Sequence, residues 1–235
     1  MYSDHMSAQM LPDQVMERFV TAVREGEFAI EETVPNETLL AERWDVSRLT
    51  VREAMRSLME LGVVEIRRGR GTFVRPLSDW SPLDRRTLAA RAQGQDGAQV
   101  QAQLLEARLI VESGVAELAA ARRKEAELAQ MEAMVDAMSK SIDEPERFAE
   151  ADLEFHDVLF GAAGNIFLDA MVKPIHDLLA DARQKTSQDP KARRLALTAH
   201  RQILQMVRDG SCDGARRAMA EHVAETAAST HGPQQ

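Results

Sequence analysis

Apolar residues near the beginning of the chain recur at the spacing of a short helix. Between residues 11 and 26 every fourth position is apolar, and these positions are Leu11, Val15, Phe19 and Val23. This spacing places one apolar stripe along one side of a helix, and Gly26 is a suitable end point. Residues 1–10 lack the apolar core of a secretory signal, so we expect only an N-terminal tail there.

Two further helices are predicted by residues that favour helix starts. Asn36 begins a helix that runs to about Trp44, and Ser47 begins the next one. Gly62 ends this third helix after Leu61. The pattern therefore predicts three short helices within the first 62 residues.

The third predicted helix has two different faces. Its core face is apolar and holds Ala54, Met55, Leu58 and Leu61. Its other face repeats arginine at every fourth position, as Arg48, Arg52 and Arg56. A DNA major groove admits a helix with such donors, so the pattern predicts a recognition helix. A solvated helix face would have the same pattern and is the alternative.

A short hairpin is predicted after the third helix. Residues 63–67 and 72–75 have strand character, and Arg68-Gly69-Arg70-Gly71 forms the loop between them. Arginines beside glycines allow the tip of a hairpin to approach phosphates or the minor groove. Helix, turn, helix and wing together predict a winged helix-turn-helix DNA-binding domain over residues 11–76.

The rest of the chain is predicted to be helical. Residues 77–97 form a linker, because the stretch from Pro76 to Pro82 holds two prolines, two serines and Trp80. Helices are then expected at residues 98–123, 124–140, 146–162, 166–186, 191–209 and 212–230. The predicted fold class is mainly α, with the winged domain followed by an all-α antiparallel bundle over residues 98–235.

The charge of the chain is unevenly distributed. The 235 residues carry a formal net charge of -9, which excludes a uniformly basic nucleic-acid coat. Between Arg43 and Arg75, however, eight arginines and no lysine stand against four acidic residues. Arginine suits bidentate contacts to guanine or phosphate. DNA binding is therefore expected to be local to this segment.

Cysteine content and hydropathy limit the compartment. Cys212 is the only cysteine, which excludes an intrachain disulfide and fits a reducing cytoplasm. No apolar run approaches the roughly 20 residues that a membrane span needs. We therefore expect a cytoplasmic protein without a membrane partner.

Four side chains of the predicted bundle have the chemistry of metal ligands. Asp152 and His156 lie one helical turn apart, and His200 and His222 stand on two other predicted helices. Apolar neighbours at helical spacing direct all four toward the core. A divalent cation would satisfy a buried carboxylate and three imidazoles in one step. The alternative, which we assign to His5 and His176, is an ordinary histidine that bonds to backbone or acids.

The N-terminal motifs resemble a known family. Four segments of the chain resemble the winged-helix domain of GntR-family bacterial transcription regulators. They are Val46-Ser47-Arg48, Val51-Arg52-Glu53-Ala54, Gly62-Val63-Val64 and Gly69-Arg70-Gly71-Thr72-Phe73-Val74. The resemblance covers residues 11–74. It implies that DNA is read from the helix and the wing by Arg48, Thr50, Arg52, Arg68 and Gly69. Thr38 departs from the pattern, because members usually carry arginine there.

The C-terminal motifs resemble the FCD effector domain of the FadR subfamily of GntR regulators. The similar segments are Asp152-Leu153-Glu154-Phe155-His156, His200-Arg201 and Glu221-His222. The resemblance implies a metal bound by Asp152, His156, His200 and His222. Zinc is the metal that we expect first, with nickel and manganese as alternatives, because these ligand types do not select one divalent ion.

Arg108 is a candidate for binding an effector. It lies on an apolar helical stripe with Leu104, Leu105, Val111 and Val115, so its guanidinium is expected to face the interior. A buried arginine needs a carboxylate, and Glu112 one turn later is one possible source. The resemblance to the FCD domain implies another source, the carboxylate of a small organic acid effector.

These features predict a DNA-binding transcription regulator, a repressor by the commoner mode of the family. The resemblance also implies a homodimer, which suits a palindromic operator. The effector is expected to act through the linker around Trp80. Two alternatives are a metal-responsive regulator with the same site and a metal-dependent hydrolase. The hydrolase is disfavoured, because a di-iron bundle needs Glu-x-x-His, and the residues three before the histidines are Leu153, Leu197 and Met219.

Overall fold

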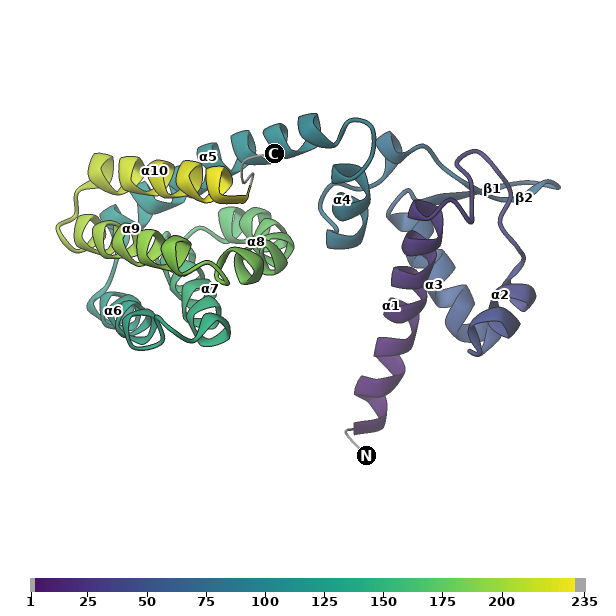
Figure 1. The fold of residues 1–235 in the computed structure, drawn as a ribbon, viewed down its shortest axis with the longest axis horizontal. Coiled ribbons are helices and arrows are strands. Elements are labelled where there is room, and N and C mark those ends of the chain that lie inside the picture. The colour runs from purple at the N-terminus through teal and green to yellow at the C-terminus, as the bar shows by residue number, and fades with distance from the viewer. Residues whose placement is uncertain (1–2, 231–235) are drawn as a thin grey trace. The chain divides into compact units, whose positions relative to one another are not determined.

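The computed structural model describes the backbone of residues 3–230 and the side chains of residues 11–171, 176, 179–180 and 183–227. The chain divides into two units, Met1–Val100 and Gln101–Gln235. The first unit contains helices and a two-stranded hairpin, and the second unit consists of helices (Figure 1).

Helices α1 (Ser3–Arg24), α2 (Glu37–Trp44) and α3 (Arg48–Glu60) form the helical part of the first unit. The side chain of Asn36 accepts hydrogen bonds from two backbone N–H groups at the start of α2. Ser47 accepts one from Thr50 at the start of α3. Both predicted caps are therefore present, because these short side chains satisfy N–H groups that the helix leaves open. Helix α1 begins earlier than expected, within the segment that we interpreted as a tail.

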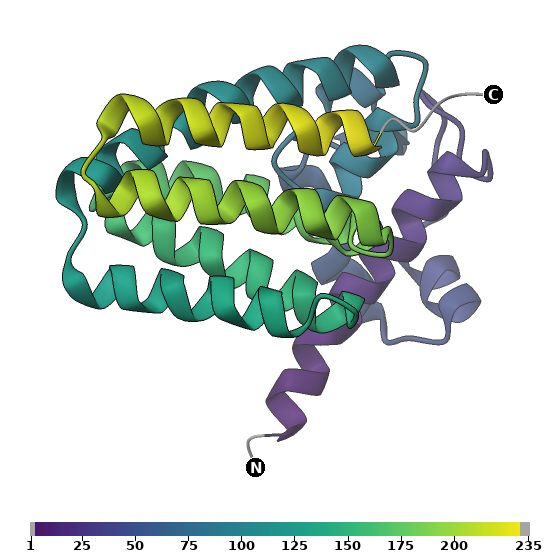
Figure 2. The ribbon, with the colours of Figure 1, turned by 60° about the vertical axis from the view of Figure 1, so that its left-hand side comes forward.

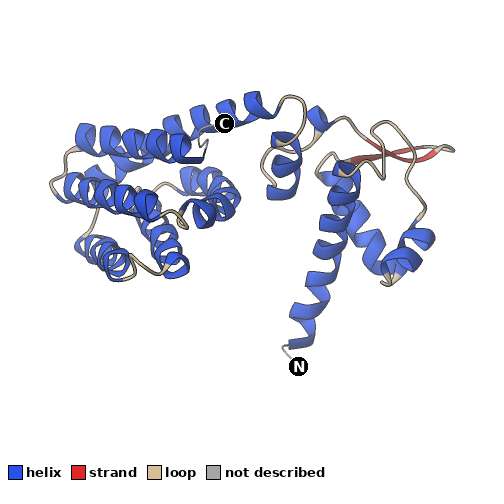
Figure 3. Cartoon of the chain, in the orientation of Figure 1, coloured by secondary structure: helices blue, strands red, loops and turns tan. Residues whose placement is uncertain are grey.

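A two-stranded antiparallel hairpin follows α3. Strands β1 (Val64–Arg67) and β2 (Gly71–Val74) pair so that Val64 faces Val74 and Arg67 faces Gly71. They are drawn in red in Figure 3. Three residues, 68–70, form the loop, and both Gly69 and Gly71 have positive φ angles. The predicted wing is confirmed, and its loop is one residue shorter than expected.

The segment after the wing packs into the first unit. It contains the 3-10 helix η1 (Leu77–Asp79) and helix α4 (Arg85–Ala92). Trp80 is only 1% exposed, and its indole N–H donates to the carbonyl of Arg75 at 3.0 Å. It shares one core with apolar residues of the helices and the hairpin, among them Phe19, Leu40, Leu58 and Val74. The beginning of the predicted linker is thus part of the folded first unit.

Six helices account for the second unit and the junction before it. They are α5 (Gly97–Arg122), α6 (Glu125–Lys140), α7 (Pro145–Ala162), α8 (Ile166–Thr186), α9 (Pro190–Arg208) and α10 (Cys212–Thr230). Helices α6 and α7 pack together, as do α9 and α10, and α9 also packs on α6. Figure 2 shows α10, α9 and α6 as successive layers. The predicted all-α bundle is confirmed.

The core of the second unit surrounds helix α7. Phe155, Leu159, Ile203 and Met219 are fully buried within one apolar cluster. Burying one such side chain stabilises a fold by roughly 1.5–3 kcal/mol. Packing of these apolar side chains therefore fixes the orientation of α7, and with it the direction of the polar side chains on its buried face. No described helix is long and apolar enough to cross a membrane.

Candidate metal centre and nucleic-acid interface

Helix α7 carries the first two candidate ligands on its buried face. Asp152 and His156 are one turn apart, so their side chains point the same way. Asp152 is 7% exposed and His156 is 0% exposed. Phe155 and Leu159, which are buried on the same helix, fix its orientation in the core. Packing of α7 thus places a carboxylate and an imidazole inside the bundle.

Helices α9 and α10 bring two more histidines to this place. The ring centroid of His156 lies 5.1 Å from that of His200 and 5.4 Å from that of His222. One ligand nitrogen from each ring lies within 4.8 Å of the other two. Oδ1 of Asp152 lies 3.3 Å from Nε2 of His200. The four residues singled out from the sequence therefore lie together in the structure.

The protonation of His200 follows from a backbone contact. Its Nδ1 lies 2.6 Å from the carbonyl oxygen of Ala196, one turn earlier on α9. Donation by Nδ1 to that carbonyl leaves Nε2 with a free lone pair. This Nε2 lies 3.2 Å from Nε2 of His156. A histidine whose other nitrogen bonds to a carbonyl is already oriented as a metal ligand.

Burial keeps the three clustered histidines neutral. It is the largest cause that lowers the pKa of His156, His200 and His222 below the usual 6.5, and the lowering is large for His156 and His222. The cation of Arg183 lowers the pKa of all three further, while Asp152 opposes the shift at His200. At neutral pH these imidazoles therefore need not lose a proton before they bind a cation.

The donor set fits a divalent metal. Neutral imidazoles and an ionised carboxylate are the ligands that zinc and similar ions take in proteins. Nδ1 of His156 is buried and has no hydrogen-bond partner among the described residues. Within the described residues this imidazole therefore buries a polar nitrogen without a partner. Such burial is unfavourable unless another group, such as a metal ion, binds at the site.

His176 was assigned an ordinary core role from the sequence, but it lies next to the cluster. Its ring centroid is 5.2 Å from that of His156 and 4.4 Å from that of Phe160. Together with Glu112 and His156 it offers a second group of ligand atoms within 4.8 Å of one another. The spacing of His176, Leu179 and Arg183, all buried on α8, is the signal that sequence analysis missed.

Arg108 and Glu112 form a buried ion pair on α5. Nε of Arg108 donates to Oε1 of Glu112 at 2.7 Å, and both side chains are almost fully buried. The internal partner that we considered as the alternative is therefore present. Nη2 of Arg108 and Oε2 of Glu112 find no partner among the described residues, so the pair is not saturated.

Arg183 on α8 is a buried cation that sequence analysis did not identify. Its Nη1 lies 3.4 Å from Oδ2 of Asp152, which is within ion-pair distance. Neither Nη1 nor Nη2 makes a hydrogen bond to the described residues. The guanidinium lines a pocket, partly open to solvent, that Asp152 and His222 also line. The candidate metal centre thus has a cavity beside it.

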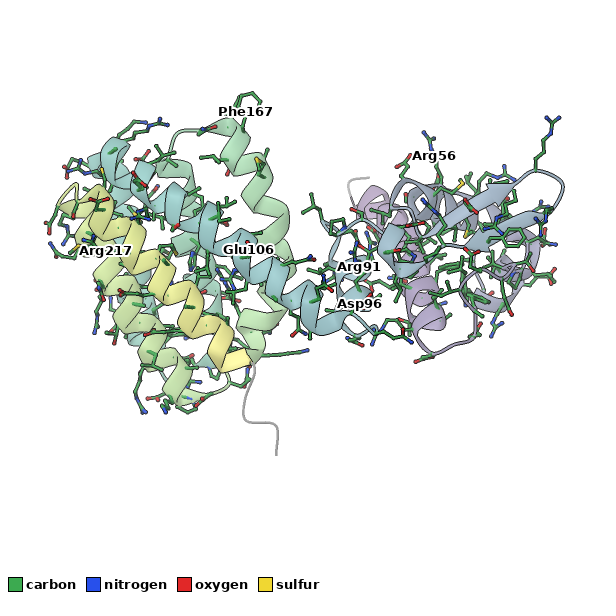
Figure 4. All side chains as sticks on the ribbon, turned by 90° about the horizontal axis from the view of Figure 1, so that it is seen from above. Arg56, Arg91, Asp96, Glu106, Phe167 and Arg217 are labelled. Carbon is green, nitrogen blue, oxygen red and sulfur yellow. The ribbon has the colours of Figure 1, made fainter. Side chains whose placement is uncertain are left out.

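The predicted recognition helix exposes its arginines. Arg48, Arg52 and Arg56 are all exposed on α3, and the side chain of Arg56 projects from the first unit (Figure 4). Arg52 forms an ion pair with Glu37 at 3.0 Å, and Arg56 forms one with Glu60 at 3.4 Å. Both pairs lie at the surface, where such contacts contribute little and exchange readily. The arginines are therefore available to another anion.

Thr50 differs from the other residues expected to read DNA. It is 9% exposed, and its hydroxyl lies 2.7 Å from that of Ser47. Its backbone N–H donates to the same Ser47 side chain at 3.0 Å. In this structure Thr50 therefore takes part in the cap that begins α3.

The wing presents its basic residues at the loop. Arg68, Gly69 and Arg70 are exposed. Arg67, by contrast, is bound to Glu65 at 2.6 Å. Both Arg67 and Arg70 lie over the ring of Phe73, at 4.3 Å and 5.5 Å from its centroid. Arg67 thus supports the hairpin, whereas the loop residues can approach a partner.

Comparison with known proteins gives matches to both units. Residues 11–74 match the family described as bacterial regulatory proteins, gntR family, and residues 103–225 match the FCD domain. The galactonate operon transcriptional repressor of Escherichia coli is 28% identical over 202 residues, covering 86% of this chain and 88% of that protein. The HTH-type transcriptional regulator LutR of Bacillus subtilis is 30% identical over 207 residues, covering 86% and 92%.

A solved structure has the same fold over most of the chain. It is that of Lar, which controls the expression of the Listeria monocytogenes agr system. Its TM-score is 0.64 at 19% sequence identity, and the alignment covers 94% of this chain and 96% of that one. At this identity the likeness extends to the fold alone.

Proposed function

The chain belongs to the GntR family of bacterial regulatory proteins and carries an FCD domain, and from this premise we propose a regulator that depends on a metal and an organic acid. Family membership makes it a DNA-binding transcription regulator, and its named relatives are regulators rather than enzymes. The proposal adds a divalent metal at the four-residue cluster and a small acid that modulates operator binding. Because a relative is a repressor, we propose repression as the mode.

Operator binding is assigned to residues of α3 and of the wing loop in the first unit, most of them exposed arginines. The residues are Arg48, Thr50, Arg52 and Arg56 of α3 and Arg68, Gly69 and Arg70 of the wing loop. Thr50 contributes through the first turn of α3, which it caps with Ser47. A homodimer would present two recognition helices to a palindromic operator in the cytoplasm.

The metal site is assigned to Asp152, His156, His200 and His222. The observation that carries this proposal is their convergence from three helices into one buried cluster of neutral imidazoles and a carboxylate. Zinc suits this set, and nickel and manganese are the alternatives. When bound, the metal would supply a Lewis-acid position for a carboxylate oxygen. The three helices would also be tied together at this point.

The acid is assigned to the interior beside Arg108. This guanidinium keeps Nη2 without a partner among the described residues, although Nε is bound to Glu112. It is also close enough to lower the pKa of His222. We propose that a small carboxylate bridges the metal and Arg108, and that it shifts DNA affinity only if it binds one arrangement of the protein better than another.

A metal-responsive regulator is the second candidate, because the cluster itself would serve either function. The two differ in what releases DNA. The test uses an operator fragment that the protein selects from a random DNA library, in a gel-shift assay at fixed zinc. Release by an organic acid supports the first candidate, whereas release by a chelator alone supports the second.

Native mass spectrometry of the full chain tests the metal and the assembly together. We expect a dimer that carries one divalent ion per protomer. A protein that takes up no zinc, nickel or manganese, while its Asp152→Asn variant behaves identically, would exclude both candidates.

A further inference from the structure

The pocket beside the candidate metal centre has polar and charged walls. Helices α7, α8, α9 and α10 all contribute to its lining, which includes Asp152, Arg183, Thr186, His222 and Thr226. Arg108 does not belong to this lining. The arginines in the lining are therefore Arg183 and Arg193, and not the Arg108 considered above.

Arg183 has hydrogen-bonding capacity that the described residues do not use. Its side chain is 6% exposed, yet Nη1 and Nη2 donate to no described group. Arg193 lines the same pocket and is equally buried, but it donates to the carbonyl oxygens of Ile142 and Ser187. Buried guanidinium groups normally have such partners, because desolvating unpaired donors is unfavourable. An arginine with unused donors at a cavity wall has the chemistry of an anion site.

Asp152 connects this arginine to the metal centre. One carboxylate oxygen lies 3.4 Å from Nη1 of Arg183, and the other lies 3.3 Å from Nε2 of His200. A metal that takes Asp152 as a ligand would claim the negative charge that now balances Arg183. The charges at the pocket would then be those of Arg183, Arg193 and the metal against those of Asp152 and Glu225, since Arg108 and Glu112 compensate each other. A bound anion reduces this excess of positive charge.

We propose that Arg183 binds the carboxylate of the acid effector in this pocket, and that metal binding at Asp152 makes Arg183 available to it. The inference rests on the proposed function, since it needs the metal and the acid, but it assigns the carboxylate to Arg183 in place of Arg108. Arg183 is then the main anchor in the pocket, whereas Arg108 is already bound to Glu112. Metal and acid each strengthen the binding of the other, as linkage requires.

The test measures zinc and acid binding separately by calorimetry on the full chain. Zinc is titrated into the metal-free protein, and succinate, citrate, L-lactate and D-galactonate are titrated into protein with and without zinc. The variants are Arg183→Gln, Arg183→Lys and Arg108→Gln. Arg201→Gln is the matched control, because Arg201 is an exposed arginine of α9 that donates to Ser139 outside the pocket. Circular dichroism establishes that each variant is folded.

The expected pattern has opposite signs for the two ligands. Arg183→Gln should bind the acid about 10- to 100-fold more weakly, as the loss of a charged hydrogen bond predicts. It should bind zinc as tightly as the wild-type protein or more tightly, because a cation near the ligands is gone. Arg183→Lys should recover part of the acid affinity, Arg108→Gln should lose less, and Arg201→Gln should change neither.

Each other outcome has a distinct meaning. Unchanged acid binding by zinc-loaded Arg183→Gln would overturn the inference and leave the proposed function intact. Weaker zinc binding by this variant would mean that Arg183 only holds Asp152 in place, and it would also overturn the inference. If zinc-loaded wild-type protein binds none of the four acids, the acid part of the proposed function fails together with the inference.

Discussion

At the scale of single residues, the charge of Asp152 is the feature on which the metal site depends. Asp152→Asn keeps the shape of the side chain but removes its negative charge. We expect zinc affinity to fall by more than the roughly 10- to 100-fold that the loss of an outer-shell partner costs, because a ligand itself is altered. Calorimetric zinc titration measures the change.

Glu154→Gln is the control for that substitution, because Glu154 is exposed on the same helix and its loss changes the net charge equally. Equal zinc affinity of Asp152→Asn and the wild-type protein would show that Asp152 is not a ligand.

The buried histidines also predict how stability depends on pH. Burial lowers the pKa of His156, His200 and His222 in the folded protein, so these groups bind fewer protons than in the unfolded chain at pH values below about 6.5. The metal-free protein should therefore lose stability as the pH falls from 6.5 toward the folded pKa values, by up to about 1.4 kcal/mol per pH unit for each histidine. Urea unfolding at pH 7.5 and 5.5 measures this loss.

The His156→Gln variant serves as the reference, because it lacks one titrating group and should lose less stability over the same interval. A free energy of unfolding that does not change between the two pH values would contradict the neutral state of the cluster.

Single residues were predictable from the sequence where a periodic pattern pointed them inward. Asp152 and His156 lie one turn apart among buried aromatic residues, so their direction followed from the helix alone. Arg183 was not predictable in this way, because its role depends on a carboxylate from another helix and on a cavity. Arg108 lies between these cases: its burial was predicted, but the choice between Glu112 and a ligand is a property of packing.

At the scale of elements, the helix boundaries were predictable because capping residues are local signals. Asn165 accepts hydrogen bonds from the N–H groups of Phe167 and Leu168 at the start of α8, and Pro190 begins α9. The start of α1 was not predictable from its apolar stripe, since the helix continues N-terminally through residues that lack this stripe. Local chemistry thus fixes the ends of helices better than hydrophobic periodicity does.

Gly62 is an element boundary whose identity the fold requires. Its φ angle is +73°, and a Cβ at this position would lie 2.5 Å from the carbonyl oxygen of Asp79. Gly62→Ala should therefore destabilise the protein by at least about 2 kcal/mol, because backbone strain and a backbone clash add together. Urea unfolding measures the difference.

Gly69→Ala is the comparison, since Gly69 also has a positive φ angle but has open space around it. It should cost only about 1 kcal/mol, from the backbone conformation alone. Equal effects of the two substitutions would mean that the segment around Asp79 can move away from α3.

The wing should contribute to DNA binding through its exposed loop. Arg70→Ala removes a cation at the tip and should weaken operator binding while lowering stability by no more than about 1 kcal/mol, because the side chain is exposed and its contact is with the ring of Phe73. If Arg70 contacts a phosphate, the dependence of log affinity on log salt should become shallower by about one unit. Fluorescence anisotropy at several salt concentrations measures this slope.

Arg194→Ala is the control for the wing, because Arg194 is an exposed arginine of α9 in the other unit. It should leave affinity and slope unchanged. A loss of affinity in Arg70→Ala at an unchanged slope would argue for a base contact instead of a phosphate contact.

At the scale of the whole molecule, the position of Trp80 changes how the two units are expected to communicate. We expected the segment around Trp80 to be a linker, yet Trp80 lies in the core of the first unit. The segment as far as Ala92, the end of α4, therefore belongs to that unit. The short stretch of residues 93–96 joins α4 to α5, and this stretch takes the place of the segment around Trp80 as the expected connection between the units.

Dimerisation is the property of the whole molecule that the described surface makes testable. Ile110 of α5 and Ile166, Phe167 and Met171 of α8 are large apolar side chains exposed in the second unit. Phe167 is 75% exposed and projects outward at the beginning of α8 (Figure 4). Exposed apolar groups of this kind commonly mark interfaces between proteins. If Phe167 is part of the proposed dimer interface, Phe167→Glu should weaken dimerisation at least about 10-fold, because a charge would be buried there.

Sedimentation equilibrium and anisotropy measure this effect together. The variant should lose affinity for a palindromic operator but keep that of the wild-type protein for a single half-site, since each DNA-binding unit remains intact. Leu83→Glu, which introduces the same charge at an exposed leucine of the first unit, is the control and should remain dimeric. A dimeric Phe167→Glu variant would exclude this face of α8. A monomeric variant with undiminished affinity for the palindrome would mean that the two DNA-binding units act independently, and regulation through the relative placement of the protomers would then have no physical basis.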